Sequence, residues 1–279
     1  MKANSLSISV PYKGCNKKKT DVCYNCCISK ITGFVENSNF NNMVFRSRKV
    51  VKFAEMAGVT SVIVTGKGEP SLNMEAVSYF GSVFSSFPLE LQTNGLFLIK
   101  NLDTVDELAF SYDTIAISID DIEKIQEFSQ VFQRIHKNGM TSRITVLLHD
   151  KNLIDPETFI RYCKTFGIDQ ISFRKITIPN NVQITKEKIE HIKWIEKNVT
   201  EDHVDTFLDY LRELIENKGH LVRKLPFGAT LYNVDGISVT YFDYCIQDDS
   251  GDEDIRSLIF HEDGHLSTSW EGSNVGRIL

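Results

Sequence analysis

Short runs of β-forming residues alternate with longer amphipathic segments from residue 5 to residue 173, and this alternation constrains the fold more than any other feature of the chain. It predicts strands at 5–11, 61–65, 89–92, 114–119, 142–148 and 170–173, with helical segments at 46–57, 74–84, 104–108, 123–137 and 156–166. Strands that are joined by helical crossovers pair in parallel. The sequence therefore predicts an α/β domain built around a parallel sheet.

The later part of the chain has a different character. Residues 186–217 are rich in Lys and Glu and lack Gly and Pro, which predicts a pair of helices that pack against the edge of the domain. We place a boundary near residue 180. Residues 1–180 are then the core domain, and residues 181–279 form a helical and β-hairpin extension that covers the mouth of the core.

Two turn signals fall in this extension. Asp235-Gly236 and Asp263-Gly264 are each flanked by β-forming residues, so we expect a hairpin at each. His261 and His265 flank the second turn, and we expect their side chains to be exposed to solvent.

Composition excludes several classes of protein. The formal net charge of −6 gives no overall basic field, which disfavours a protein that grips long nucleic acid through many phosphates. No apolar run approaches the length of a membrane span, and the first residues carry no apolar segment typical of a secretory signal. We therefore expect a cytoplasmic protein with neither a membrane nor long nucleic acid as a partner.

The cysteines are unevenly distributed. Four of the six lie between Cys15 and Cys27, which is unlike a disulfide framework and indicates a metal site in a reducing compartment. Cys163 and Cys245 stand apart, and two spare cysteines are too few for a second full cluster. We expect no auxiliary cluster, and we expect Cys163, on a predicted helix, to be a buried apolar residue.

The early cysteines follow the first predicted strand directly. Cys15, Cys23 and Cys26 are spaced C-x7-C-x2-C, and Cys27 can replace Cys26 as the third of the set. Three thiolates can hold a 4Fe-4S cluster and leave one iron open to another ligand. The alternative is a zinc site, because four cysteines can close a tetrahedron around that ion.

Three further segments lie at the ends of predicted strands, where a parallel barrel builds its ligand site. They read TGKGEP at 65–70, LQTNG at 91–95 and AISID at 116–120. With the cysteine loop, these segments resemble the radical S-adenosylmethionine (AdoMet) superfamily, whose usual loop is C-x3-C-x2-C. The first gap is longer here, Lys67 stands where the second glycine of the familiar motif lies, and the aromatic residue, Tyr24, comes one position early.

The resemblance implies a partial (β/α)6 barrel with a C-terminal α/β extension, and a 4Fe-4S cluster on Cys15, Cys23 and Cys26. It implies that AdoMet chelates the open iron, with Glu69 near its ammonium group. The residues implied to contact AdoMet are Gly66, Gly68, Glu69, Asn94, Ser118, Asp120, Arg143 and Arg174. Each of the two arginines can pair with a carboxylate or a phosphate, and a structural salt bridge is the alternative for either one.

The same resemblance implies an enzyme that cleaves AdoMet reductively to a 5′-deoxyadenosyl radical, with a flavodoxin or ferredoxin as electron donor. That radical abstracts hydrogen from a substrate, which we expect to be a small molecule or a nucleotide. Activation of a glycyl-radical enzyme is a competing role within this chemistry. A regulatory or binding protein with zinc in the cysteine loop is the alternative from another class.

Overall fold

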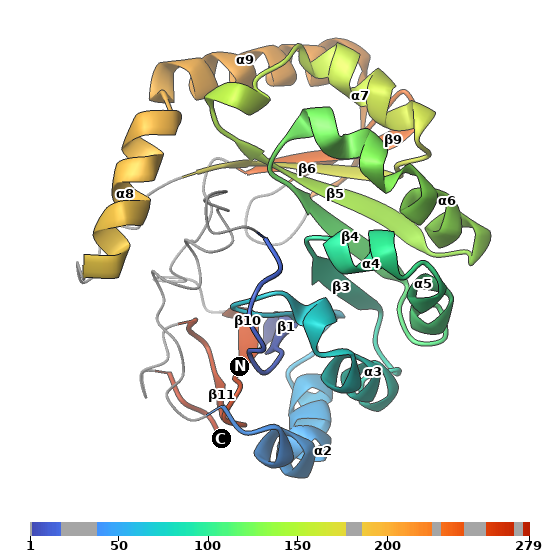
Figure 1. Ribbon diagram of the computed structural model, residues 1–279, viewed down its shortest axis with the longest axis vertical. Helices are drawn as coiled ribbons and strands as arrows, with labels where there is room; N and C mark the ends of the chain where they lie inside the picture. Colours follow the sequence, from blue (N-terminus) through green and yellow to red (C-terminus); the bar gives the residue numbers. More distant parts are fainter. Residues whose placement is uncertain (1, 18–37, 177–185, 225–229, 243–254, 271–275) are drawn as a thin grey trace. The chain divides into compact units, whose positions relative to one another are not determined.

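The computed structural model describes residues 2–17, 38–176, 186–224, 230–242, 255–270 and 276–279. Its residues form two compact units, one comprising Met1–Ile115 with Asp248–Leu279 and the other Ala116–Gln247. The division falls within β4 (Thr114–Ile119). Each unit has its own strands and helices, many of which are labelled in Figure 1.

The first unit contains strands from both ends of the chain. The strands lie in the order β11-β10-β1-β2-β3, with β10, β1, β2 and β3 parallel and β11 antiparallel to β10. Their bounds are β1 Ala3–Ser9, β2 Ser61–Thr65, β3 Leu89–Thr93, β10 Ile255–Phe260 and β11 Leu266–Ser267. The helices are α2 Phe40–Met56, η1 Pro70–Leu72, α3 Met74–Val83, α4 Leu96–Lys100 and α5 Asp103–Leu108.

The core of this unit follows from its buried strands. Leu6 and Ile8 of β1 are fully buried, and Ser5 and Ser7, which alternate with them, are also buried, as expected for a parallel strand covered on both faces. Phe80 of α3 packs edge-on against Phe260 of β10. β10 is therefore part of the core of this unit.

The second unit continues the alternation of helix and strand. Its strand order is β4-β5-β6-β9-β8-β7, where β5, β6 and β9 are parallel and β8 is antiparallel to both of its neighbours. The further strands are β5 Thr141–Leu148, β6 Gln170–Lys175, β7 Gly219–Lys224, β8 Thr230–Val234 and β9 Ile237–Phe242. The helices are η2 Ile122–Phe128, α6 Ser129–Lys137, η3 Asp150–Asn152, α7 Pro156–Thr165, α8 Lys186–Asn198 and α9 Glu201–Lys218.

Several sequence predictions are confirmed at this level. The six predicted strands match β1 to β6, and the charged stretch forms the helical pair α8 and α9. Asp235 and Gly236 have φ angles of 52° and 90° and join β8 to β9 as a hairpin turn, while Gly264, with φ 88°, lies between β10 and β11. Cys163 is fully buried, and burial raises the pKa of its thiol.

The expectation that His261 and His265 are exposed is wrong. Their side chains are 0% and 4% exposed. The turn between them lies against α2, because a Cβ added at Gly264 would lie only 3.0 Å from the backbone of Asn42. Parallel pairing of β10 with β1 carries this turn into the interior of the first unit.

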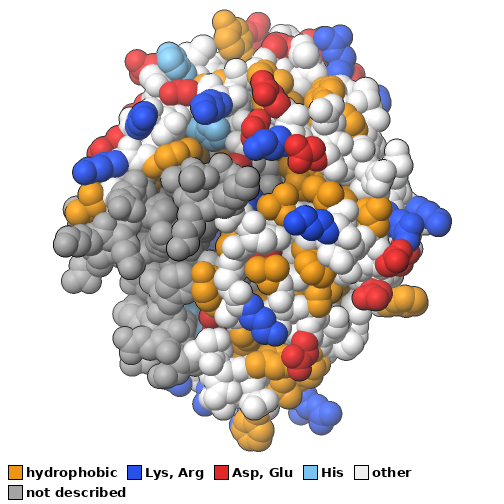
Figure 2. Space-filling view, viewed as in Figure 1, with side chains coloured by type: hydrophobic (Ala, Val, Ile, Leu, Met, Phe, Trp, Pro, Cys, Tyr) orange, Lys and Arg blue, Asp and Glu red, His pale blue; other side chains and the backbone are white. Residues whose placement is uncertain are grey.

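The later strands pair with earlier strands of their own unit. In the second unit β9 pairs in parallel with β6, and in the first unit β10 pairs in parallel with β1. The compact units thus divide the chain at other positions than residue 180, and the proposed boundary and capping role of 181–279 stay predictions. None of the described helices is long and apolar enough to cross a bilayer. Figure 2 shows acidic and basic side chains interspersed on the described surface in that view.

Candidate functional site

Glu69 joins two of the predicted ligand loops in the first unit. It follows β2, and its carboxylate accepts hydrogen bonds from the Ser71 amide (2.9 Å), the Ser71 hydroxyl (2.6 Å), the Thr93 hydroxyl (2.5 Å) and the Asn94 amide (2.8 Å). The side chain is 5% exposed. The TGKGEP loop after β2 and the TNG segment after β3 are therefore held together by one buried carboxylate.

The two glycines of the TGKGEP loop lie close to the chain that leads into the cysteine loop. A Cβ at Gly68 would be 2.4 Å from the Gly14 carbonyl oxygen and 2.6 Å from the Tyr12 ring. A Cβ at Gly66 would be 3.4 Å from the Val10 carbonyl oxygen. Only a residue without a side chain fits at position 68, so the loop after β2 and the segment after β1 are packed backbone against backbone.

Cys15, in the segment after β1, lies beside the end of β3. The Asn94 carboxamide nitrogen is 3.9 Å from the Cys15 sulfur and donates a hydrogen bond to it. The same nitrogen donates to the Asn16 side-chain oxygen at 2.8 Å. A hydrogen-bond donor of this kind orients a thiolate ligand and stabilises its charge.

Lys67 is buried in the same loop, with 4% of its surface exposed. Burial lowers its pKa, and the negative charge of Glu262 raises it. Glu262, just after β10, accepts hydrogen bonds from the Ser9 hydroxyl (3.1 Å) and the Tyr12 amide (3.3 Å). Burial raises the pKa of Glu262, while those two hydrogen bonds and Lys67 lower it.

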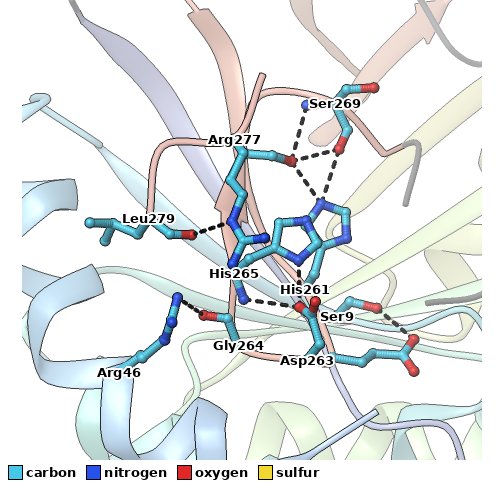
Figure 3. Close-up of polar contacts among 11 residues, drawn as sticks. Ser9, Arg46, His261, Asp263, Gly264, His265, Ser269, Arg277 and Leu279 are labelled. Carbon is cyan, nitrogen blue, oxygen red and sulfur yellow. Dashed lines mark hydrogen bonds and ion pairs between the residues drawn. The ribbon is translucent and has the colours of Figure 1, made fainter. Parts of the chain in front are cut away.

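A pair of stacked imidazoles lies beside Glu262. The rings of His261 and His265, drawn in Figure 3, are stacked: they are parallel within 11° and their centroids are 4.1 Å apart. His265 Nδ1 is 2.5 Å from the Asp263 carboxylate, and His261 Nε2 is 3.1 Å from the Ser269 carbonyl. Burial, followed by the neighbouring charges of His265 and Lys67, lowers the pKa of His261 to about 3.

Sequence reasoning missed this part of the first unit. The two histidines were predicted to be exposed and Glu262 received no interpretation, because the motif-bearing loops and β10 are far apart in the chain. A single signal pointed to a buried partner: Lys67 stands in a loop where the resemblance leads one to expect glycine.

The candidates in the second unit lie on or after its strands. Ser118 is half-buried on β4. The Asp120 carbonyl accepts hydrogen bonds from the Asn152 carboxamide (2.9 Å) and lies 2.8 Å from His149 Nε2, so the backbone after β4 is fixed by η3 and the residue before it. Arg143, on β5, donates from Nε to the Gln170 side-chain oxygen at 3.0 Å.

Arg174, near the end of β6, has different surroundings. Its guanidinium lies over the Phe242 ring, 5.1 Å from the ring centroid. Its buried Nε has no hydrogen-bond partner among the described residues. The salt bridge considered for this arginine is not among the ion pairs of the described residues.

Several predicted positions fall outside the described residues, namely Cys23, Cys26, Cys27, Cys245 and the acidic run 248–254. Within the described part of the chain, no group of three His, Cys, Asp or Glu side chains is arranged to hold a metal ion. Cys15 is the described member of the predicted ligand set. Its thiol, oriented by Asn94 at the carboxyl end of parallel strands, suits a thiolate-bound iron–sulfur cluster.

Comparison with known proteins gives matches in structure alone. No family model matches the sequence, and no curated protein matches it. SuiB from Streptococcus suis has a TM-score of 0.61 at 14% identity over 96% of this chain and 60% of SuiB. Its form bound to S-adenosylmethionine gives 0.59 at 14% identity, over 99% of this chain and 63% of that chain.

A third similar structure is native anSMEcpe with bound AdoMet and Kp18Cys peptide. It has a TM-score of 0.60 at 12% identity over 99% of this chain and 76% of anSMEcpe. The chain thus spans about 60% of the length of SuiB and about three quarters of anSMEcpe. These neighbours confirm the predicted fold class, an α/β partial (β/α)6 barrel of the radical AdoMet type with a C-terminal α/β extension.

Proposed function

We propose that this chain, which has the fold of radical AdoMet enzymes, binds a 4Fe-4S cluster through Cys15, Cys23 and Cys26 and cleaves AdoMet reductively. The observation that carries the proposal is the meeting of three loops in the first unit: the Cys15 thiol, Asn94 after β3 and the TGKGEP loop after β2. When bound, the cluster supplies one electron to AdoMet, which releases methionine and a 5′-deoxyadenosyl radical.

The residues of the first unit have distinct roles in this proposal. Gly66 and Gly68 are the proposed main-chain contacts for AdoMet, and the missing side chain at Gly68 lets its loop pack against Gly14 and Tyr12. Asn94 orients the Cys15 thiolate through its carboxamide. Glu69, predicted to meet the AdoMet ammonium, already accepts four hydrogen bonds, so we assign it chiefly the positioning of Asn94 and the loop.

In the second unit, Ser118 and Asp120 are the proposed contacts for AdoMet, with Arg143 and Arg174 as partners of an anionic group. A reducing cytoplasm suits a site that needs cysteine thiolates, and a flavodoxin or ferredoxin is the proposed electron donor.

For the substrate, we propose a small molecule or a nucleotide, since the sequence has too few spare cysteines for an auxiliary cluster. A peptide substrate is the second candidate. It is favoured by two similar structures, SuiB bound to the precursor peptide SuiA, with a TM-score of 0.55, and anSMEcpe with bound Kp18Cys peptide. Activation of a glycyl-radical enzyme also fits the same chemistry.

The first test is anaerobic reconstitution with iron and sulfide, followed by reduction in the presence of AdoMet. We expect about four irons per chain and formation of 5′-deoxyadenosine. Cys23→Ala should abolish both, whereas Cys163→Ala, at a buried helical position, is the matched control and should retain both. Zinc at about one equivalent per chain without any nucleoside product would instead support the zinc-binding alternative.

A second pair of variants decides the third ligand. If Cys26 is the ligand, Cys26→Ala loses the cluster and Cys27→Ala keeps it. The reverse result would assign Cys27. Substrate classes are then compared by incubating the reduced enzyme with nucleotides, small metabolites or peptides, and measuring which class increases the yield of 5′-deoxyadenosine.

A further inference from the structure

The three parallel strands β5, β6 and β9 of the second unit have one apolar face. Phe173 of β6 packs against Phe159 of α7, with ring centroids 5.9 Å apart, and against Phe207 of α9 at 5.5 Å. In register with Phe173 are Val146 of β5 and, on β9, Tyr241. This face is therefore the one that the helices cover.

The opposite face of the same three strands is polar. Side chains on a strand alternate between faces, so each strand contributes every second residue to this surface. The residues, in registered rows, are Arg143, Thr145 and Leu147 of β5; Gln170, Ser172 and Arg174 of β6; and Ser238, Thr240 and Phe242 of β9. Parallel sheets usually have apolar residues on both faces, so this composition calls for an explanation.

Three polar atoms on this face are buried and have no hydrogen-bond partner among the described residues. They are Ser172 Oγ, Arg174 Nε and Thr240 Oγ1. Ser172 and Thr240 are directly in register on adjacent strands, and Arg174 lies two residues beyond Ser172 on the same face. Ser172 is only 3% exposed. Each buried group without a partner costs about 1–3 kcal/mol, and a cluster of three is unusual without a ligand.

The chemistry of these groups points to an anion. A guanidinium only donates hydrogen bonds, and each hydroxyl can donate one. The charged side chains among the nine residues of this face are Arg143 and Arg174, both positive, whereas Arg143 Nε is already occupied by Gln170. Contact with the Phe242 ring restricts the position of the Arg174 guanidinium, and a guanidinium matches the geometry of a carboxylate or a phosphate.

We propose that Arg174, Ser172 and Thr240 form a subsite that binds a carboxylate or phosphate group of the substrate. This inference rests on the proposed function and deepens it, because it defines the substrate as an oxyanion-bearing molecule. It also assigns Arg174 to the substrate and not to AdoMet. Arg174 is the charged donor of the subsite, and the two hydroxyls donate from the adjacent registered positions.

The test is a calorimetric titration of the reconstituted full chain with inorganic phosphate and, separately, with acetate. We expect one of the two anions to bind to the wild type, which distinguishes a phosphorylated from a carboxylated substrate. Arg174→Gln should raise the Kd for that anion at least about tenfold, and Thr240→Val and Ser172→Ala about fivefold each. Arg212→Gln is the matched control, because Arg212 lies near Tyr241, on the helix-covered face.

A readout of stability separates binding from a structural role. Because the Ser172 and Thr240 hydroxyls have no partner to lose among the described residues, Ser172→Ala and Thr240→Val should melt at or above the wild-type temperature. Lower melting temperatures in both, together with unchanged anion binding, would show that the hydroxyls are structural and would overturn the proposal. Absence of binding of either anion to the wild type would overturn it as well.

An assay of 5′-deoxyadenosine formation without added substrate distinguishes failure of the anion subsite from failure of the proposed function. If Arg174→Gln weakens anion binding and leaves the apparent KM for AdoMet unchanged, the subsite is supported. If it raises the KM for AdoMet and leaves anion binding unchanged, Arg174 belongs to the AdoMet site and the inference is wrong. If the wild type binds the anion but forms no nucleoside, the proposed function fails and the anion subsite stands.

Discussion

Replacing Glu69 by Gln should destabilise the first unit far more than a typical surface change. Glu69 Oε1 accepts three of its hydrogen bonds, from Ser71 and Thr93, and Oε2 accepts the one from the Asn94 amide. A glutamine that keeps its oxygen toward Ser71 and Thr93 turns its NH2 group toward the Asn94 N–H. That buried donor then faces another donor and loses its partner.

The expected loss in the free energy of unfolding can be worked out from these four hydrogen bonds. Losing one charge-assisted bond costs about 2 kcal/mol, and the three that remain weaken because the acceptor is neutral, by about 2 kcal/mol together. We therefore expect a loss of about 4 kcal/mol in the free energy of unfolding of this unit, which corresponds to a fall in Tm of roughly 10 °C. An ion pair between exposed side chains contributes much less to the free energy of unfolding.

The assay is urea denaturation of the full chain, followed by circular dichroism, alongside thermal unfolding. Glu55→Gln is the matched control, since Glu55 is exposed on the last turn of α2, and its change should stay within about 0.5 kcal/mol. If the free energy of unfolding of Glu69→Gln is also within about 1 kcal/mol of the wild-type value, the carboxylate is not the link between the loops after β2 and β3. The role assigned to Glu69 is then wrong.

Three further predictions concern Gly68, His261 and Cys163. Gly68→Ala should lower iron incorporation on reconstitution, because its Cβ would lie 2.4 Å from the Gly14 carbonyl oxygen, and iron content equal to the wild type would contradict this. Wild-type stability should fall as the pH drops from 6.5 toward about 3, since the depressed pKa of His261 favours its neutral form in the folded state. His261→Asn should flatten that slope by up to about 1.4 kcal/mol per pH unit, whereas the exposed His220→Asn should not; equal slopes would refute the assignment. Cys163→Ser should cost about 1–3 kcal/mol in denaturant titrations, because a hydroxyl would replace a buried thiol, and no change would contradict this.

The β/α order of the chain could be predicted because each strand and helix has its own local pattern. Apolar runs with β-branched residues gave β2 and β4, and helical spacing gave α6 and α7. The start of α2 could not be found in this way, because the predicted helix began at residue 46 and the actual helix begins at Phe40. Its beginning depends on Asn39, whose side chain caps the helix by accepting from the Asn42 amide.

The candidate site was predictable where strand ends carry motifs and not where partners come from distant parts of the chain. The TGKGEP loop and Asn94 follow consecutive strands, and parallel order brings such strand ends together. Of the polar face of β5, β6 and β9, the sequence analysis identified Arg143 and Arg174 alone. Two helices and two strands separate β6 from β9 in the chain. Its pairing with β6 depends on tertiary packing, and Thr240 therefore received no functional interpretation from the sequence.

Lys67 lies beside Glu262, which follows β10 and contacts the segment that leads to Cys15. A buried lysine without a partner would cost several kcal/mol, and so would a buried Glu262. The two charges offset one another, and Glu262 also binds the Ser9 hydroxyl and the Tyr12 amide in the segment that leads to Cys15. Lysine at a position where the superfamily resemblance suggests glycine is thus tolerable here because β10, added in parallel beside β1, delivers a carboxylate to it. β10 and the residue pair that follows it, His261 and Glu262, accordingly support the segment that leads to Cys15, although about 250 residues separate Glu262 from Ser9 and Tyr12 in the chain.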